Sequence, residues 1–386
     1  MLSGTHRFPR QDLVTYGRPA VEALRELAAS WHNRRLLIVT TASLENGLAA
    51  VLAEELGELC AGVFAGVTAH SPREGVIAGA EAARRSEADL LVAFGGGSAI
   101  DAAKVMQLCL WADLTRVEEL DPYRAGRGPD RVRVADIPAG VRMAAIPTTL
   151  SAAEFTPFAG VTDRAKQAKE GYAHPMLAPR AVILDAAVTL ATPAELWFST
   201  GLKAIDHAVE QLCNPQRAPY ADALAEDALR RLTRGLAATK ADVAALDARE
   251  DSQFGMWLAM SGVGSGRGMG PSHAIGHTLG GTYGIAHGIT SCIALPAVLK
   301  WSEGYADERL ALVSNLMGAP GLPASEAVKR LVVSLGLPTD LKSVGIGRES
   351  FQAIAEHTMH DAGVRTGARA ITGPEDIVAI LQLAAG

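Results

Sequence analysis

Apolar runs alternate with amphipathic segments through the first half of the chain. The runs predict buried strands at 35–40, 61–65 and 89–94, with helices at 44–56 and 71–85 between them. Strands that are apolar on both faces and separated by helices are typical of a parallel sheet covered on both sides. Shorter β-type runs predict further strands near the edge of the same sheet at 142–146, 155–162 and 181–184.

Two local signals refine this pattern. Ser71, Pro72 and Glu74 stand in the order of an N-terminal capping box, which predicts that Ser71 caps the helix that follows. Residues 112–139 break the alternation, since charged residues, proline and glycine dominate there. They predict an exposed insertion or flap, and roles in substrate access, in an oligomer contact or as surface decoration all stay open.

The pattern changes after Pro193 to a series of long amphipathic segments without a strand between them. These segments predict helices at 194–213, 219–239, 251–265, 272–282, 289–303, 307–318, 325–335, 349–360 and 374–385. The chain therefore predicts an α/β domain at 1–187 and an all-helical domain at 188–386.

Composition narrows the class of protein. With 386 residues, 48% of them hydrophobic, the chain can bury two substantial cores. A net charge of -6 and a pI near 6.0 exclude a basic nucleic-acid-binding surface. No segment has the apolar length of a membrane span, and the polar start of the chain does not resemble a signal peptide.

The four cysteines are scattered, and no two form a CxxC pair. This spacing argues against a thiolate zinc site and against a disulfide framework. We therefore expect a reducing compartment, the cytoplasm.

A glycine turn follows the strand at 89–94. Gly95, Gly96, Gly97 and Ser98 lie between this strand and a helix expected from Ala99. Glycines there let backbone amides approach a ligand, and the helix N-terminus favours an anion, so the turn suits a pyrophosphate. A plain tight turn is the competing interpretation. Asp101 and Lys104 lie on the first helical turns, where a solvated helix face is the simple alternative.

The stretch from Ser272 to Gly288 (SHAIGHTLGGTYGIAHG) carries the most distinctive chemistry. His273 and His277 are four residues apart, so they share one helix face, and glycines at 280, 281 and 284 predict a bend before His287. Three imidazoles can thus converge as a metal site, a proton-transfer site or a packed core.

A second helix offers a similar pair. Lys203 and His207 are also four apart, with Asp206 expected on a different face of that helix. A single buried histidine is most often a core residue. Four histidines in two paired spacings, together with a candidate dinucleotide cradle, favour a functional site.

These motifs make the chain resemble the iron-containing (group III) alcohol dehydrogenase family, in particular its maleylacetate reductase-like branch. The resemblance covers nearly the whole chain and rests on GGGSAIDAAK (95–104), IPTTLSAAEFTPF (146–158), TGLKAIDHAVE (200–210) and the histidine stretch. Asp101 is the residue typical of the alcohol dehydrogenase branch. The resemblance implies a dehydroquinate synthase-like architecture, with a dinucleotide-binding α/β domain ahead of an all-helical domain.

The resemblance also implies where the cofactor binds. Gly95, Gly96, Gly97 and Ser98 would hold the pyrophosphate of NAD(H) or NADP(H), and Asp101 would lie by the nicotinamide. Thr148 and Thr149 would flank the adenine and ribose. At Thr41 the family often has an acidic residue that binds the ribose hydroxyl. Its absence here leaves NADPH as open as NADH.

In metal-dependent members of the family, one aspartate and three histidines hold iron or zinc. His207, His273 and His287 match the histidines, but Lys203 stands at the aspartate position. An ammonium group cannot ligate a cation and repels it. The resemblance thus predicts a degenerate metal site, in which Lys203 supplies the positive charge by the substrate oxygen. His277, which is no ligand in the family, is the expected proton relay.

The sequence therefore predicts an NAD(P)-dependent oxidoreductase that acts on a carbonyl, alcohol or oxo-acid such as maleylacetate. The alternatives are a metal-dependent alcohol or aldehyde dehydrogenase, a lyase of the dehydroquinate synthase type and a catalytically inactive binding relative. We expect a small-molecule substrate and a homodimer, with no nucleic-acid or membrane partner.

Overall fold

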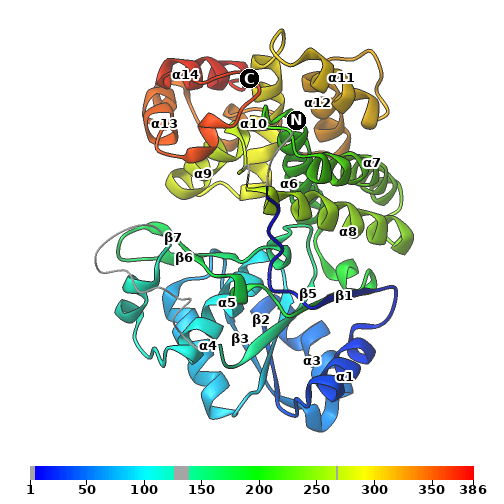
Figure 1. Ribbon diagram of the computed structural model, residues 1–386, viewed down its shortest axis with the longest axis vertical. Helices are drawn as coiled ribbons and strands as arrows, with labels where there is room; N and C mark the ends of the chain where they lie inside the picture. Colours follow the sequence, from blue (N-terminus) through cyan, green and yellow to red (C-terminus); the bar gives the residue numbers. More distant parts are fainter. Residues whose placement is uncertain (1–4, 126–138, 267) are drawn as a thin grey trace. The chain divides into compact units, whose positions relative to one another are not determined.

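The computed structural model describes residues 5–125, 139–266 and 268–386. The chain divides into two compact units, which are considered separately (Figure 1). One unit comprises Phe8–Ala191. The other comprises Thr192–Gly386 together with residues 5–7.

A parallel sheet forms the centre of the Phe8–Ala191 unit. Its six strands run in the order β1-β8-β5-β4-β2-β3, and every neighbouring pair is parallel. The bounds are β1 Leu13–Tyr16, β2 Leu36–Thr41, β3 Cys60–Val67, β4 Leu90–Gly95, β5 Arg142–Pro147 and β8 Ala181–Leu184. Each residue of β4 and β8 is buried, which is why these strands carry no polar alternation.

Helices cover both faces of the sheet, as predicted. Alternate strand residues such as Leu36 and Ile38 pack with α1 (Ala20–Trp31) and α3 (Ala50–Leu56) in one core. The opposite face carries α4 (Arg73–Arg85) and α5 (Gly97–Trp111), which also pack against each other (Figure 1).

The predicted capping box is wrong. Helix α4 begins at Arg73, and no side chain caps it. Ser71 has a φ of 48°, and its hydroxyl donates a hydrogen bond of 2.8 Å to the carbonyl oxygen of Ser98. A tertiary contact thus uses the hydroxyl that the local pattern assigned to the helix.

The helix expected at 44–56 is interrupted. Gly47 has a non-helical backbone (φ -122°, ψ -112°) inside a π-helical turn, Glu45–Ala49. Only three helical residues, α2 (Ala42–Leu44), precede this turn, and α3 follows it. Glycine tolerates such a break because it has no Cβ.

The expected strand at 155–162 is not part of the main sheet. It corresponds to β6 (Phe158–Asp163), which pairs with β7 (Ala168–Ala173) in a separate antiparallel ribbon. The pattern also missed β1 and β7, which are short and only partly buried.

The predicted insertion at 112–139 lies partly outside the described residues, which omit 126–138. In the described part, a 3₁₀ helix (Val117–Tyr123) places Leu120 in the core, so this portion is not simply exposed. The buried Arg73 forms ion pairs with Asp121 of this helix and with Glu170 of β7. These contacts attach the start of the insertion to α4 and to the ribbon.

The Thr192–Gly386 unit is helical throughout its described residues. The bounds are α6 Ala194–Cys213, α7 Pro219–Ala241, α8 Leu246–Ser261, α9 Pro271–Tyr283, α10 His287–Trp301, α11 Asp307–Leu316, α12 Ala324–Leu335, α13 Phe351–Thr358 and α14 Pro374–Leu383. These bounds follow the predicted segments closely. Helix α10 is buried from Gly288 to Leu299 and packs against α6, α9, α12 and α14, so it is the core helix of the unit.

The bend in the histidine stretch occurs at the last of the three glycines and before His287, as predicted. Helix α9 continues through Gly280 and Gly281 and ends at Gly284, whose φ of 71° requires a residue without a Cβ penalty. His287 then opens α10. Within the part of the chain that the structure describes, no helix is long and apolar enough to cross a membrane.

Lys104 does not lie on a solvated helix face. Its side chain is 0% exposed, and its Nζ donates to the carbonyl oxygens of Ala153 and Phe158, both at 2.6 Å. One turn earlier, Asp101 Oδ2 accepts a 3.1 Å bond from the amide of Gly160. Both side chains therefore attach α5 to the segment that leads into β6.

We expect Lys104→Met to lower the free energy of unfolding by about 1–3 kcal/mol, because two carbonyl oxygens lose the buried ammonium that donates to them. Denaturant unfolding measures this difference. The exposed Lys329→Met is the matched control and should unfold like the wild type. Equal stability of the two variants would contradict the proposed anchoring.

Candidate functional site

The carboxyl ends of β2, β4 and β5 lie together at one edge of the sheet. The hydroxyl of Thr40 donates to the carbonyl oxygen of Phe94 at 2.7 Å, and the amide of Thr148 donates to that of Gly95 at 3.0 Å. The nucleotide-site residues predicted on these strands and on the turns that follow them therefore gather at this edge. They are Thr41, Gly95, Gly96, Gly97, Ser98, Thr148 and Thr149.

The turn after β4 is closely packed, so a side chain there would require its neighbours to shift. A Cβ on Gly96 would lie 3.0 Å from Cγ2 of Thr149, and one on Gly97 would lie 3.1 Å from Oγ of Ser151. Helix α5 begins at Gly97, and no side chain caps its N-terminus. The hydroxyl oxygen of Thr149 is buried and has no hydrogen-bond partner within the described residues. Uncapped amides beside a buried hydroxyl fit the pyrophosphate of a dinucleotide.

Asp101 lies next to this turn, but its carboxylate has structural contacts. Oδ2 accepts the amide of Gly160, and Oδ1 lies 3.7 Å from Nζ of Lys104. The side chain is 17% exposed. Its contact with the nicotinamide therefore stays a prediction.

Four histidines gather in the helical unit, on α6, α9 and the start of α10. Ring centroids lie 4.8 Å apart for His207 and His273, 5.8 Å for His273 and His287, and 5.3 Å for His277 and His287. The structure therefore places together the imidazoles that the sequence predicted to converge. The bend at Gly284 lets α10 return His287 to the face of α9.

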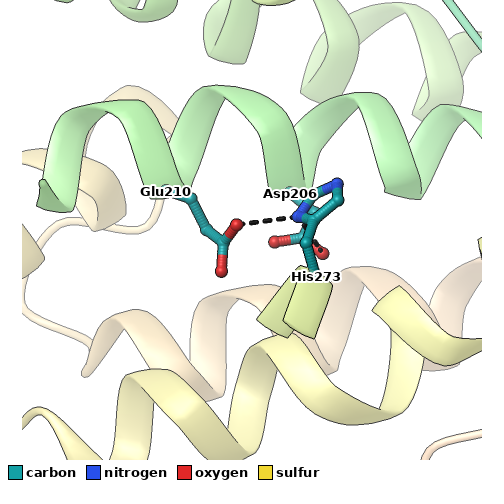
Figure 2. Close-up of side chains that lie close together, drawn as sticks. All are labelled: Asp206, Glu210 and His273. Carbon is teal, nitrogen blue, oxygen red and sulfur yellow. Dashed lines mark hydrogen bonds and ion pairs between the residues drawn. The ribbon is translucent and has the colours of Figure 1, made fainter. Parts of the chain in front are cut away.

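A buried carboxylate that the sequence reasoning missed anchors this cluster. Glu210 of α6 accepts hydrogen bonds from the amides of Gly270 (2.6 Å) and Ser272 (2.7 Å) and from Nδ1 of His273 (2.7 Å; Figure 2). A Cβ on Gly270 would lie 2.6 Å from the carboxylate, so glycine is required there. The usable signal was the position of Glu210, three residues after His207 on the same helix.

Asp206 does not point away from the site, contrary to the expectation of a different face. It is fully buried, its Oδ2 accepts the hydroxyl of Ser272 at 2.8 Å, and it lies 3.5 Å from Nδ1 of His273 (Figure 2). The side chain reaches α9, the helix packed beside α6.

Burial controls the charge of these groups. It raises the pKa of both Asp206 and Glu210 to about 7, and it lowers the pKa of His273 to about 4. His273 is therefore neutral near pH 7. Because its Nδ1–H is donated to Glu210, its Nε2 carries the lone pair, and this atom is buried without a partner among the described residues.

His207, like His273, has a lowered pKa. Burial holds its pKa well below the usual range, and electrostatic interactions with His273 and Lys203 lower it further. The ammonium of Lys203 also lowers the pKa of His273. Lys203 thus acts on both imidazoles from the position where the family places an aspartate.

The side chains present do not fit a divalent cation. Among the described residues, two groups bring three ligand atoms within 4.8 Å of one another: Asp206, Glu210 and His273, and Asp121, Asp163 and Glu170. The predicted set of His207, His273 and His287 is not one of them. In the first group, Glu210 is bound by His273 and by backbone amides, whereas Oδ1 of Asp206 has no partner among the described residues. Ion pairs with Arg73 and Lys166 fill the second group. A lysine ammonium at the fourth position opposes a cation further.

His277 has a different environment from His273. Its side chain is 55% exposed, and its Nδ1 lies 2.7 Å from Oδ2 of Asp361. This bond with His277 holds the pKa of Asp361 below its usual range. Asp361 was missed because 84 residues separate it from the histidine.

Comparisons with known proteins match both units. The family model for iron-containing alcohol dehydrogenases matches residues 12–186. The family model for the C-terminal part of the same family matches residues 197–385. Maleylacetate reductase 2 of Cupriavidus pinatubonensis is 31% identical over 96% of this chain and 94% of its own length. The crystal structure of maleylacetate reductase from Agrobacterium tumefaciens has a TM-score of 0.83 at 27% identity, covering 100% of this chain and 99% of that one.

A further solved structure shares the fold at lower identity. Sulfoacetaldehyde reductase from Bifidobacterium kashiwanohense, in complex with NAD+, has a TM-score of 0.88 at 20% identity, covering 100% of this chain and 99% of that one.

The chain belongs to the iron-containing alcohol dehydrogenase family. The predicted fold is confirmed: a parallel-sheet α/β domain and an all-helical domain in the dehydroquinate synthase-like architecture. The protein is an NAD(P)-dependent oxidoreductase, as its sequence predicted. These matches do not favour the alternatives over that function.

We expect Glu210→Ala to lower the free energy of unfolding by about 3 kcal/mol, because three buried donors lose their acceptor. The measurement is denaturant unfolding followed by circular dichroism. Glu226→Ala is the control, since Glu226 makes only a 3.6 Å ion pair with Arg230 on the surface of α7. A loss no greater than that of the control would show that Glu210 does not anchor α9.

Proposed function

We propose that this protein reduces an oxo-acid such as maleylacetate with NADH or NADPH, and that it does so without a bound metal. The observation that carries the proposal is Lys203, which stands on α6 four residues before His207 and in place of the family's metal-binding aspartate. Its charge acts on His207 and on His273. A fixed ammonium can bind the substrate oxygen or a substrate carboxylate, the work that a cation would otherwise do.

Each residue then has a distinct task. The glycine turn at 95–98 and the N-terminus of α5 bind the pyrophosphate. When bound, the nicotinamide supplies the hydride. Lys203 stabilises negative charge on the substrate oxygen, and His277 delivers the proton to it. His207, His273 and His287 line the site as polar contacts.

We further propose that the working form is a homodimer in the cytoplasm. The β1 strand lies at one edge of the sheet, and its Leu13 and Tyr16 are exposed. An edge strand with exposed apolar side chains suits pairing with a second copy of the chain. We expect a small-molecule substrate, with no nucleic-acid or membrane partner.

Replacement of the lysine tests the chemistry. We expect Lys203→Ala to lower kcat with maleylacetate by about 100-fold, the loss typical of removing one charge-stabilising donor. Lys203→Arg should keep part of the rate, and Lys329→Ala should keep all of it. Lys203→Asp restores the family's carboxylate, so its activity should depend on added Fe²⁺ or Zn²⁺. Unchanged turnover in Lys203→Ala, or loss of wild-type activity to a chelator, would refute the metal-free mechanism.

Thr41 tests the choice of cofactor. This residue ends β2, and its hydroxyl lies 2.9 Å from that of Ser43 without a carboxylate on either side chain. We expect Thr41→Asp to lower kcat/KM for NADPH relative to NADH by about 10-fold, because a carboxylate repels a 2'-phosphate by about 1 kcal/mol at close range in water. Thr41→Asn has a similar shape without the charge, so a shift of equal size in that variant would exclude charge repulsion.

A further inference from the structure

Two histidines one turn apart on α9 are each bound at Nδ1 by a carboxylate from another element. His273 is bound by Glu210 of α6, and His277 is bound by Asp361. The first pair is buried, and it belongs to the interior of the cluster (Figure 2). The second pair lies at its accessible side, with side-chain exposures of 55% and 30%. Only the second is placed to exchange a proton with water.

The backbone holds Asp361 in a fixed orientation. Asp361 caps the 3₁₀ helix Ala362–Arg365, and its Oδ1 accepts the amide of Gly363 at 2.8 Å. This leaves Oδ2 for Nδ1 of His277, at 2.7 Å. A carboxylate with one oxygen bound to backbone has a restricted rotamer, so it presents the second oxygen in one direction.

The 3₁₀ helix is itself attached to the start of α9. The hydroxyl of Thr366 donates to the carbonyl oxygen of Met269 at 2.6 Å, and a Cβ on Gly363 would lie 2.8 Å from the carbonyl oxygen of Gly270. On the neighbouring helix α13, the hydroxyl of Thr358 donates to that of Thr278 at 3.0 Å. These contacts fix the distance between Asp361 and the helix that carries His277.

From this geometry we infer that Asp361 is the positioning residue for His277. By holding Nδ1, it orients the ring so that Nε2 is the atom that gives up the proton. The carboxylate accepts Nδ1–H, which fixes the tautomer and the ring orientation. The His287 ring, stacked at 5.3 Å and 19°, supports the same orientation.

The inference rests on the proposed function, in which His277 supplies the proton. In the reduction, the carbonyl carbon gains a hydride from the nicotinamide and its π electrons move to oxygen. That oxygen takes the proton from Nε2, which leaves an alcohol, an oxidised cofactor and a neutral imidazole. Water then returns a proton to the exposed His277.

A double-mutant cycle tests the inference. We expect Asp361→Ala to lower kcat by about 10- to 100-fold, within the usual range for acid–base groups, with KM for the cofactor unchanged. His277→Ala should lower kcat at least as far. The double variant should match His277→Ala, because a residue that acts only through the imidazole has nothing to add once the ring is absent. If Asp361→Ala lowered kcat by the same factor in the wild type and in His277→Ala, the inference would be overturned.

Asp376→Ala is the matched control. Asp376 likewise accepts a backbone amide at the start of a helix, that of Thr372 at 2.8 Å, and has no contact with the histidines. Its variant should keep the wild-type kcat. If it loses as much activity as Asp361→Ala, the effect comes from helix capping and the inference is wrong.

A readout that needs no substrate separates this inference from the proposed function. In ¹⁵N–¹H spectra of histidine-labelled protein, with His277→Ala for assignment, the neutral form of His277 should carry its one proton on Nδ1 in the wild type and populate both tautomers in Asp361→Ala. Unchanged spectra would overturn the inference even in an active enzyme. Changed spectra, with full activity in His277→Ala, would leave the positioning contact intact and refute the proton relay.

Discussion

The helical unit depends on one buried carboxylate, that of Glu210. It accepts the amides at the start of α9 and the Nδ1–H of His273, so a single group sets the position of the helix and the tautomer of its first histidine. This anchor positions both histidines of α9, since they lie one turn apart on the same face of the helix. The chemistry then differs by burial: His273 is enclosed and neutral, whereas His277 is open to water.

In the α/β unit, buried side chains likewise hold one helix in place. The amides at the start of α5 are left uncapped, and the glycines before them leave space that Thr149 and Ser151 border closely. Lys104 and Asp101, on the same helix, hold the segment that leads into the β6–β7 ribbon. A helix that is anchored by its buried side chains can present its N-terminus to an anion without rearranging.

Lys203 separates this chain from the metal-dependent pattern of its family. The ammonium charge lowers the pKa of His207 and of His273, which favours the neutral form of both imidazoles. The two inward-facing carboxylates lie at Nδ1 of His273.

The sequence by itself determined most of the strands and helices and the spacings within the histidine cluster. Continuous apolar strands, the 3.6-residue period of the helices and the four-residue spacings of Lys203–His207 and His273–His277 are local, so they survive in any fold that forms those helices. Tertiary structure alone decided which side chains meet. The hydroxyl of Ser71 binds Ser98 rather than capping a helix, and Asp206 accepts the hydroxyl of Ser272. Glu210 and Asp361 bind histidines that are 63 and 84 residues away in the sequence. Local periodicity cannot encode such contacts, because they depend on how separate helices pack rather than on any spacing within one of them.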